Sequence, residues 1–491
     1  MSSPAPTPVL DTKRGKQTLL LLLAVAFLDF IDASIVNVAL PSIRADLGFT
    51  VRNLQWVLTG YLLTYGGLML LGGRASDLFG RRRLLVAGTI QFALSSLAAG
   101  VSPDDTVLIV ARMIQGAGAA MMIPAALSIL TTTFSEPGDR YKAMGAWGAV
   151  GGLASAVGVF LGGVITHFID WRWVFFVNLP AAALILRAIF LLIPADEKVT
   201  RRGSLDVLGA VLITAGMLLL VYTIVEAPSV GWGDARTIAG FAAAAGILAV
   251  FVGYEARHPN PVFPFSIFRV KGLAAADVTM VTAMAGFYTM FLFITLYLQN
   301  VLGLGPLPAG AAYVAPALGV AVSAAVATNL MGRVGTRPVI VVGAVLGAGG
   351  IFWLSRIPVD GSYWSNVLPG LMVTAFGLGG VLVGTTTAAQ GGVSPDKAGL
   401  AAALINSSLW LGGALGVAIF SAVATSTTAD RLAKHASPPA ALTAGLQDGL
   451  LLAAIFLAGA AVIALRSPNT HGEQAALSES VPTPELASEA A

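Results

Sequence analysis

Residues 19–40 read LLLLLAVAFLDFIDASIVNVAL, and Asp29 and Asp32 are the only ionisable side chains in that run. An α-helix crosses the hydrocarbon core of a bilayer in about 20 predominantly apolar residues, so the run predicts a membrane-spanning helix. A basic cluster at 13–16 precedes it, as in a signal peptide. The apolar run continues to Leu40 without a small-residue cleavage site, however, which indicates a retained first span.

The rest of the chain has the same character. Its 491 residues are 56% hydrophobic and 11% charged, with a mean hydropathy of +0.82. A typical globular domain has about 25% charged residues. Apolar runs of adequate length recur fourteen times, near residues 19–40, 54–72, 84–101, 105–127, 141–164, 172–193, 205–226, 236–254, 273–300, 309–330, 338–355, 363–388, 400–424 and 445–466. We therefore expect an all-α polytopic membrane protein with fourteen transmembrane helices.

The distribution of basic residues supports this number of spans. Cytoplasmic loops of membrane proteins carry an excess of Lys and Arg. With a cytoplasmic N-terminus, 19 of the 28 Lys and Arg residues fall in cytoplasmic segments and seven in outer loops. One helix more or fewer would invert every later loop and remove the bias. We expect both termini in the cytoplasm and the chain in a cytoplasmic (inner) cell membrane. The same bias accounts for the net charge of +3, so a nucleic-acid partner is not indicated.

The residue content argues against several kinds of chemistry. The chain has no cysteine, which excludes thiol catalysis and cysteine-ligated metals, and its four histidines are scattered singly. A metal site needs clustered ligands. No lysine is followed by Ser or Thr, as a Walker-type phosphate loop requires. We expect no enzyme, no catalytic residue, no metal and no cofactor. Any work must draw on an ion gradient or on a separate subunit.

A weak internal repeat divides the chain. The stretch GRRRLLVAG at 80–88 resembles GTRPVIVVG at 335–343, and each joins a cytoplasmic turn to a new helix. In transporters built from two parallel halves, the substrate site lies at their interface. The division that we expect is a cytoplasmic tail (1–18), an N-terminal six-helix half (19–193), two additional linking helices (205–254), a C-terminal six-helix half (273–466) and a disordered cytoplasmic tail (467–491).

Four local motifs, in order along the chain, point to a known family. They are DASIVNVALP at 32–41, GRASDLFGRRR at 73–83, RMIQGAGAA at 112–120 and WRWVFFVNLP at 171–180. Together they resemble the major facilitator superfamily, and specifically its fourteen-helix drug:proton antiporter family, over residues 19–466. The resemblance implies two six-helix halves plus two additional central helices, and export of drugs or antibiotics in exchange for protons.

Two acids and one arginine inside the spans carry the expected chemistry. Asp29 and Asp32 lie about one helical turn apart, hence on neighbouring parts of one face. Intramembrane acids usually face a cavity or a transport pathway, because a charge there costs about 2.5–3.5 kcal/mol on insertion scales. Burial and a like-charged neighbour both favour the protonated form of a carboxyl group. We expect Asp32, which matches the family motif, and also Asp29 to bind and release protons. The resemblance implicates Arg112 in the same coupling. A static structural pair is the alternative.

The stretch 73–83 is expected to be a cytoplasmic gating loop, as the resemblance implies. Its glycines permit a tight turn, and its acid can face the positive N-terminus of another helix. Ser394-Pro395 has the residues of such an N-terminus. Charge that merely sets the topology is the alternative. The residues expected to act in the gate are Gly73, Asp77, Gly80 and Arg81.

Polar and aromatic residues within the spans are candidates for lining a substrate cavity, although a single aromatic side chain more often packs between helices or faces lipid. Trp410 stands where the matching family stretch usually has a polar residue, which favours flat or apolar substrates. Gly158 is followed by Val159 instead of the proline that is typical of antiporters, a departure that weakens the antiport assignment. The candidates are Asn37, Tyr61, Tyr65, Gln115, Phe287, Phe291, Gln299, Asn406 and Trp410.

Three functions remain open on the sequence alone. The leading hypothesis is proton-driven export of amphiphilic organic compounds by alternating access, performed by a monomer. The second is proton-coupled import or facilitated passage of a specific small solute. The third is a membrane receptor that does not transport, and buried Asp29, Asp32 and Arg112 argue against it, because a passive scaffold gains nothing from their insertion cost.

Overall fold

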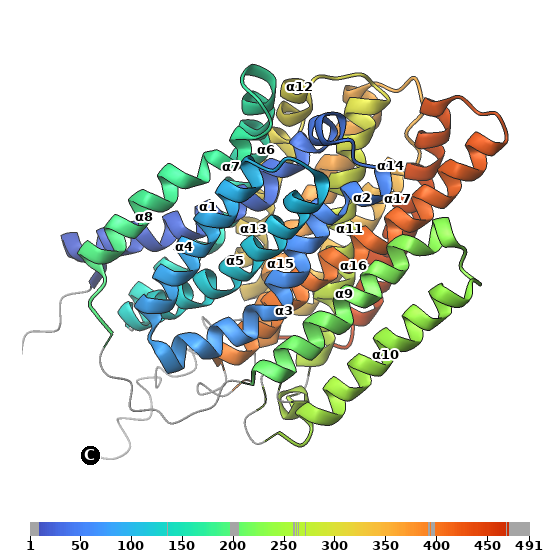
Figure 1. Ribbon diagram of the computed structural model, residues 1–491. Coiled ribbons are helices and arrows are strands. Elements are labelled where there is room, and N and C mark those ends of the chain that lie inside the picture. Colours follow the sequence, from blue (N-terminus) through green and yellow to red (C-terminus); the bar gives the residue numbers. More distant parts are fainter. Residues whose placement is uncertain are drawn as a thin grey trace, which may run out of the picture.

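The computed structural model describes residues 9–134, 136–196, 206–258, 261, 263, 265–270, 272–390, 393, 398–467 and 469–470. Within these ranges the chain forms helices joined by short connections and contains no strand (Figure 1), so the expected all-α class is confirmed. The helices are α1 (Lys13–Leu47), α2 (Val51–Leu54), α3 (Trp56–Phe79), α4 (Arg81–Gly100), α5 (Asp105–Thr133), α6 (Pro137–Phe168), α7 (Trp173–Phe176), α8 (Asn178–Leu192), α9 (Val207–Val230), α10 (Ala235–Glu255), α11 (Leu273–Asn300), α12 (Pro306–Ala311), α13 (Val314–Val334), α14 (Thr336–Leu354), α15 (Leu368–Gln390), α16 (Ala398–Ala433) and α17 (Pro438–Ala464), with short turns η1 (Val9–Asp11), η2 (Phe265–Arg269) and η3 (Tyr363–Val367).

The number of spans agrees with the sequence. In the described part of the chain, thirteen helices are long and apolar enough to cross a membrane. A further helix, α6, is 32 residues long and contributes the shorter apolar stretch Leu153–Phe168. Each of the fourteen apolar runs read from the sequence corresponds to one helix, or to a short helix or turn followed directly by a longer helix. The chain is a multi-pass membrane protein.

Several helices extend beyond their apolar runs. Residues 9–18, expected in the N-terminal tail, instead form η1 and the beginning of α1. The hydroxyl of Thr12 accepts a hydrogen bond from the backbone N–H of Gly15 at 2.9 Å. That cap starts the helix in the polar region, where apolarity gives no signal. Most of the expected C-terminal tail, residues 471–491, lies outside the described residues.

The two sets of helices on either side of the linking pair pack alike. In the N-terminal set, α1 packs on α6, and α3 and α4 both pack on α5. In the C-terminal set, α11 packs on α16, and α13 and α14 both pack on α15. Small residues allow the close approaches: a Cβ at Gly158 of α6 would meet the backbone of Ile31 in α1 at 2.9 Å. The two sets meet chiefly where α3 packs on α16 and where α6 packs on α12 and α13.

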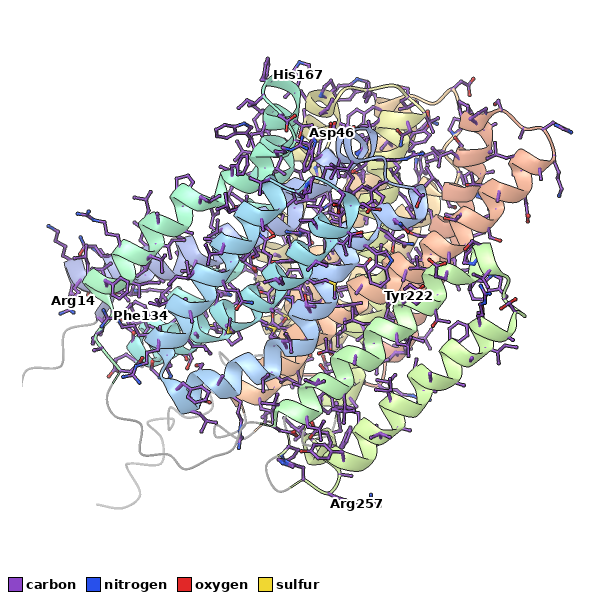
Figure 2. The ribbon with its side chains drawn as sticks, viewed as in Figure 1. Arg14, Asp46, Phe134, His167, Tyr222 and Arg257 are labelled. Carbon is purple, nitrogen blue, oxygen red and sulfur yellow. The ribbon has the colours of Figure 1, made fainter. Side chains whose placement is uncertain are left out.

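The bundle has two distinguishable ends. Both described chain ends lie at one of them, because the backbone N–H of Leu10 donates to Asp139 at the start of α6 and residue 470 lies beside the start of α14. Arg14 and Phe134 mark this termini-bearing end at the lower left of Figure 2, whereas Asp46 and His167 mark the opposite end. We call the opposite end the α12 end, since α2, α7 and α12 all lie there (Figure 1).

The expected loop at 73–83 is wrong for every residue but Gly80, because 73–79 are the last turns of α3 and 81–83 begin α4. The break between α3 and α4 is confined to Gly80, whose φ of 102° is a conformation that glycine adopts without strain. Asp196, four residues beyond α8, caps α4: its two carboxylate oxygens accept the backbone N–H groups of Arg82 and Arg83 at 3.0 and 2.9 Å. This acid lies outside the span motifs.

The C-terminal set repeats this arrangement. Gly335, with a φ of 84°, separates α13 from α14. Asn469, five residues beyond α17, accepts the backbone N–H of Arg337 at 3.0 Å, and the carbonyl of Ser467 accepts the Arg337 Nε–H at 2.8 Å. In each set, a residue that follows the last helix accepts the first backbone N–H groups of the helix after the glycine: Asp196 for α4 and Asn469 for α14. These two glycine turns lie in the two stretches of the sequence repeat.

Candidate functional site

The centre of the N-terminal set holds a completely buried ion pair. Asp32 of α1 and Arg112 of α5 are both 0% exposed, and the Arg112 Nη1 lies 2.6 Å from the Asp32 Oδ2. Arg112 also donates to the Gln115 Oε1 at 2.7 Å and to the Val57 carbonyl at 3.1 Å, and its guanidinium lies 4.2 Å from the centre of the Tyr61 ring. The cation thus has three further partners besides Asp32.

Asp32 is likewise held by more than the arginine. Its Oδ1 accepts hydrogen bonds from the Gln115 Nε2 at 2.8 Å and from the Asn178 Nδ2 at 2.7 Å. Asn178 also donates to the Ser96 hydroxyl at 2.9 Å, so α4 and α8 join α1 and α5 around one carboxylate. Hydrogen bonds to a charged group contribute more than neutral ones, and this network keeps the intramembrane charge compensated.

Two buried atoms in this network have no partner among the described residues: the Arg112 Nη2 and the Asn178 Oδ1. Buried polar groups are nearly always paired, so an unpaired donor and an unpaired acceptor mark a place where water or a rearranged side chain fits.

Asp29 occupies a separate environment one turn away on α1. Its Oδ1 accepts a hydrogen bond from the Tyr61 hydroxyl at 2.9 Å, and its Oδ2 accepts one from the Tyr65 hydroxyl at 2.8 Å. No cation contacts Asp29 in the part of the chain that the structure describes. Tyr61 connects the two acids, because its hydroxyl bonds Asp29 while its ring faces Arg112.

An aromatic cluster extends from the two acids to the C-terminal set of helices. Trp410 of α16 stacks on Tyr65 with ring centres 4.4 Å apart, and it also contacts Tyr61, Phe30 and Tyr288 at 6.0–6.4 Å. A Cβ at Gly66 of α3 would approach Trp410 to 3.1 Å. Four of the candidate cavity residues, namely Tyr61, Tyr65, Gln115 and Trp410, therefore lie together around the two acids.

The other three polar candidates, Asn37, Asn406 and Gln299, bond to backbone carbonyls. Asn37 and Asn406 donate to backbone carbonyls four residues earlier on their own helices, at 3.2 and 2.8 Å. Gln299, near the α12 end of α11, donates to the Val38 carbonyl of α1 at 2.9 Å. Gln299 is thus a contact between the two sets of helices.

The aromatic candidates on α11 are divided by helical geometry. Phe287 packs between α14 and α17, where its ring lies against Gly347. Neighbouring residues on a helix point about 100° apart, and the next residue, Tyr288, is the one that reaches Trp410. The Phe291 ring lies 5.5 Å from that of Tyr313, also away from the acids. The structure does not bring Phe287 and Phe291 to the cluster.

The expected gate residues lie at the termini-bearing end. Asp77 is 52% exposed and lies 3.8 Å from Arg81, whose guanidinium also donates to the Thr132 hydroxyl at 2.9 Å. Gly73 approaches Pro124 of α5. The helix start expected at Ser394-Pro395 lies outside the described residues, so it provides no partner for Asp77 here.

Sequence reasoning missed three residues around buried acids. Asn178 was quoted within a motif but was not predicted to touch Asp32, and Ser96 carried no signal. Asp277 of α11 is 5% exposed, inside a predicted span. The rule that selected Asp29 and Asp32, an acid within an apolar run, applies to Asp277 equally.

Comparison with known proteins places the chain in a family. The family model of the Major Facilitator Superfamily matches residues 22–417. The puromycin resistance protein pur8 of Streptomyces alboniger is 40% identical over 446 residues, which cover 90% of this chain and 88% of that protein. The cephamycin export protein CmcT of Amycolatopsis lactamdurans is 37% identical over 458 residues, 92% of each chain.

A solved structure agrees on the fold. A bacterial homologue of the human lysosomal transporter Spinster, in an inward-facing and unoccupied conformation, superposes with a TM-score of 0.62 at 17% identity, covering 94% of this chain and 97% of that one. The chain therefore belongs to the Major Facilitator Superfamily, and the expected family resemblance is confirmed.

Proposed function

We propose that the protein exports amphiphilic organic compounds from the cytoplasm in exchange for protons, by alternating access between its two sets of helices. The relatives support export, because their names record resistance to puromycin and export of cephamycin. The observation that carries the proton coupling is the buried Asp32–Arg112 pair with its spare partners. The partners of the protein in this proposal are a small-molecule substrate, protons and the lipid bilayer.

The geometry suits a carboxylate that is protonated and released in turn. Arg112 cannot lose its charge. When a proton neutralises Asp32, the cation keeps Gln115, the Val57 carbonyl and the Tyr61 ring as partners. Neutralisation of the acid therefore does not strand a bare buried charge, whose cost would block the step.

Asp29 is the second proton-binding group in this proposal. With Asp32 paired to Arg112, a charged Asp29 would add a net negative charge to the buried cluster, whereas a protonated Asp29 leaves it neutral. Burial without a cation favours the neutral acid. In this proposal Asp29 exchanges protons as well as Asp32, and Tyr61 links the two sites through its contacts with Asp29 and Arg112.

The substrate site proposed lies beside this cluster, where α3 meets α16. Trp410, Tyr65 and Tyr288 pack against one another there and would part to receive a flat ligand, and a nearby acid favours cationic or hydrogen-bonding groups on it. This composition fits amphiphilic ring compounds. Because the aromatic rings come from both sets of helices, a bound compound would contact both, as alternating access requires.

We propose that the termini-bearing end faces the cytoplasm, which the basic-residue bias supports. The α12 end then faces outward, and the two sets of helices touch there through Gln299 with Val38 and through Gly163 with Gly310. The conformation described is thus sealed at these outer contacts. A single chain supplies both sets, so we propose that it acts as a monomer in the cytoplasmic membrane.

The test uses inside-out vesicles with an acid interior and a pH-sensitive dye. Adding an exported compound, for example a lipophilic cation or an aromatic antibiotic, should release protons from the lumen of wild-type vesicles. Asp32→Asn should abolish this release, since it removes the proton site. Asp430→Asn, the same change at an exposed position on α16, should behave like wild type.

Undiminished gradient-driven export by Asp32→Asn would overturn the role of Asp32. Labelled compound leaving the vesicles, or crossing equally with and without the gradient, would instead indicate an importer or a facilitator.

A further inference from the structure

A further buried acid lies in the C-terminal set of helices, outside the site described above. Asp277, on α11, is 5% exposed. Its Oδ1 accepts a hydrogen bond from the Ser408 hydroxyl of α16 at 3.0 Å. Its Oδ2 is also buried and has no partner in the described part of the chain. The hydroxyl of Ser407, beside Ser408 on α16, is buried without a partner as well.

No cation compensates this carboxyl group among the described residues. Asp277 forms no salt bridge there. The charged side chains on the elements packed around α11 are engaged or remote. On α1, Asp29 and Asp32 are held by Tyr61, Tyr65 and Arg112. The other charged residues of α1 lie in its first or last turns: Lys13, Arg14 and Lys16, which are exposed, and Arg44 and Asp46, the latter paired with Arg172. α15 has no charged residue, Arg337 of α14 is bonded to Ser467, Asp448 of α17 is bonded to Thr427, and Asp430 and Arg431 lie at the α12 end of α16. The side chain of Arg269 in η2 is outside those described.

An ionised carboxylate is poorly stabilised in this position. One neutral hydroxyl does not replace the hydration of a charge, and an unpaired buried charge costs far more than an unpaired neutral group. The positive end of α11 contributes little, because the effect of a helix terminus falls off within the first turn. Asp277 is the fifth residue of α11, beyond that turn. The geometry therefore disfavours the ionised form of Asp277 relative to that of an exposed aspartate.

The position of Asp277 suits proton exchange with one side of the membrane. It lies about 6 Å along the helix axis from the start of α11, at the termini-bearing end. Its partner Ser408 is two residues from Trp410, which stacks on Tyr65, and the Tyr65 hydroxyl bonds Asp29. A change at Asp277 therefore acts on the helix that joins the two sets.

We propose that Asp277 is an additional proton-binding site in the C-terminal set of helices, which adds one proton to the number exchanged per molecule of substrate. The inference rests on the proposed exchange of compounds for protons. To add to the exchange, the proton reaches Asp277 from the outer side in a conformation that is open there and closed to the cytoplasm, and it leaves to cytoplasmic water when α11 and α16 part at Ser408. No other bond is made or broken.

The test is the proton-to-substrate ratio of the full-length protein in proteoliposomes. A neutral compound that the wild type exports is set against a series of pH gradients, and the gradient at which net flux reverses gives the ratio. Asp277→Asn keeps the acceptor for Ser408 but cannot bind a proton, so its ratio should be lower than that of the wild type by one. Asp277→Glu should restore the ratio. Ser408→Ala should keep it, because the carboxyl remains.

The outcomes separate this inference from the proposed function. An unchanged ratio in Asp277→Asn overturns the inference while leaving the proposed exchange intact. A loss restricted to cationic compounds at an unchanged ratio also overturns it, since Asp277 would then recognise substrate. If the wild type moves no protons, the proposed function itself fails.

A second measurement covers the case in which Asp277→Asn does not insert. Dicyclohexylcarbodiimide modifies protonated carboxyl groups in apolar surroundings. Peptide mapping of the treated wild-type protein at neutral pH should find Asp277 modified, at a lower level when the medium is made alkaline. Modification of other carboxyl groups with none at Asp277 would overturn the inference.

Discussion

Replacing Asp32 and replacing Arg112 should lower the free energy of unfolding by unequal amounts. Unit charges about 4 Å apart attract by about 4 kcal/mol at an effective dielectric constant of 20, and removing one partner of a buried pair typically costs about 3–5 kcal/mol. Asp32→Asn leaves Arg112 with a charge that it cannot lose. Because Gln115, the Val57 carbonyl and the Tyr61 ring remain in contact with that charge, we expect a loss near the lower limit, about 3 kcal/mol.

The reverse change should cost less. Arg112→Gln leaves Asp32 with its donors Gln115 and Asn178, at 2.8 and 2.7 Å, and the acid can also take a proton. We expect a loss of about 1–2 kcal/mol, comparable to one charged hydrogen bond. The double variant should lose less than the sum of the two, with a coupling of about 2 kcal/mol or more, since neither charge remains.

The free energy of unfolding is measured by denaturing-detergent titration in mixed micelles, followed by tryptophan fluorescence from the eight tryptophans. Asp430→Asn serves as the control for the loss of an exposed acid. Equal losses in the two single variants, or losses that add within about 0.5 kcal/mol, would refute the argument that the pair is compensated asymmetrically.

Two further predictions concern the ends of the bundle. Asp196→Ala should lower the free energy of unfolding by about 1 kcal/mol, as the loss of a helix cap does; Asp196→Asn, which keeps an acceptor, should lose less, and equal values for both variants would contradict the capping role. Gly163→Val should reduce transport at least tenfold without unfolding the protein, because even a Cβ at that position would lie 2.7 Å from the Pro306 carbonyl and hold the α12 end open. Labelling of a single cysteine introduced at Val38, in a chain with no native cysteine, should rise in Gly163→Val; unchanged transport and labelling would show that the outer contact is not a gate.

The spans were predictable because each is a long apolar run, and the bilayer gives every run the same requirement. The ends of the helices were not, because they depend on caps: α1 begins at Lys13 through Thr12, and α4 through Asp196, 115 residues away from Arg81 in the chain. The prediction of a loop at 73–79 failed for the same reason, because apolarity does not show where a helix ends. Glycines and charges there are compatible with the last turns of a helix whose break needs one residue only.

The buried acids were predictable one by one, but their partners were not. Asp29, Asp32 and Arg112 stand out in the sequence because ionisable residues in apolar runs are expensive. That Asn178 bonds Asp32 depends on the packing of α8 against α1, which the sequence does not reveal. Phe287 and Tyr288 differ by one position, and only the packing of α11 decides which of them reaches Trp410.

The linking pair of helices has a mechanical consequence. Of the described elements, α10 packs on α9, whereas α9 also lies against α3 of the N-terminal set and α16 of the C-terminal set (Figure 1). Thr214 of α9 fits over Gly67 of α3, where a Cβ would lie 2.6 Å from its hydroxyl oxygen. The Thr214 side chain thus packs into the space left by Gly67, which holds α9 closely against α3. In the proposed alternating access, the α9–α10 hairpin would move with α3, and α16 would slide along both α3 and α9.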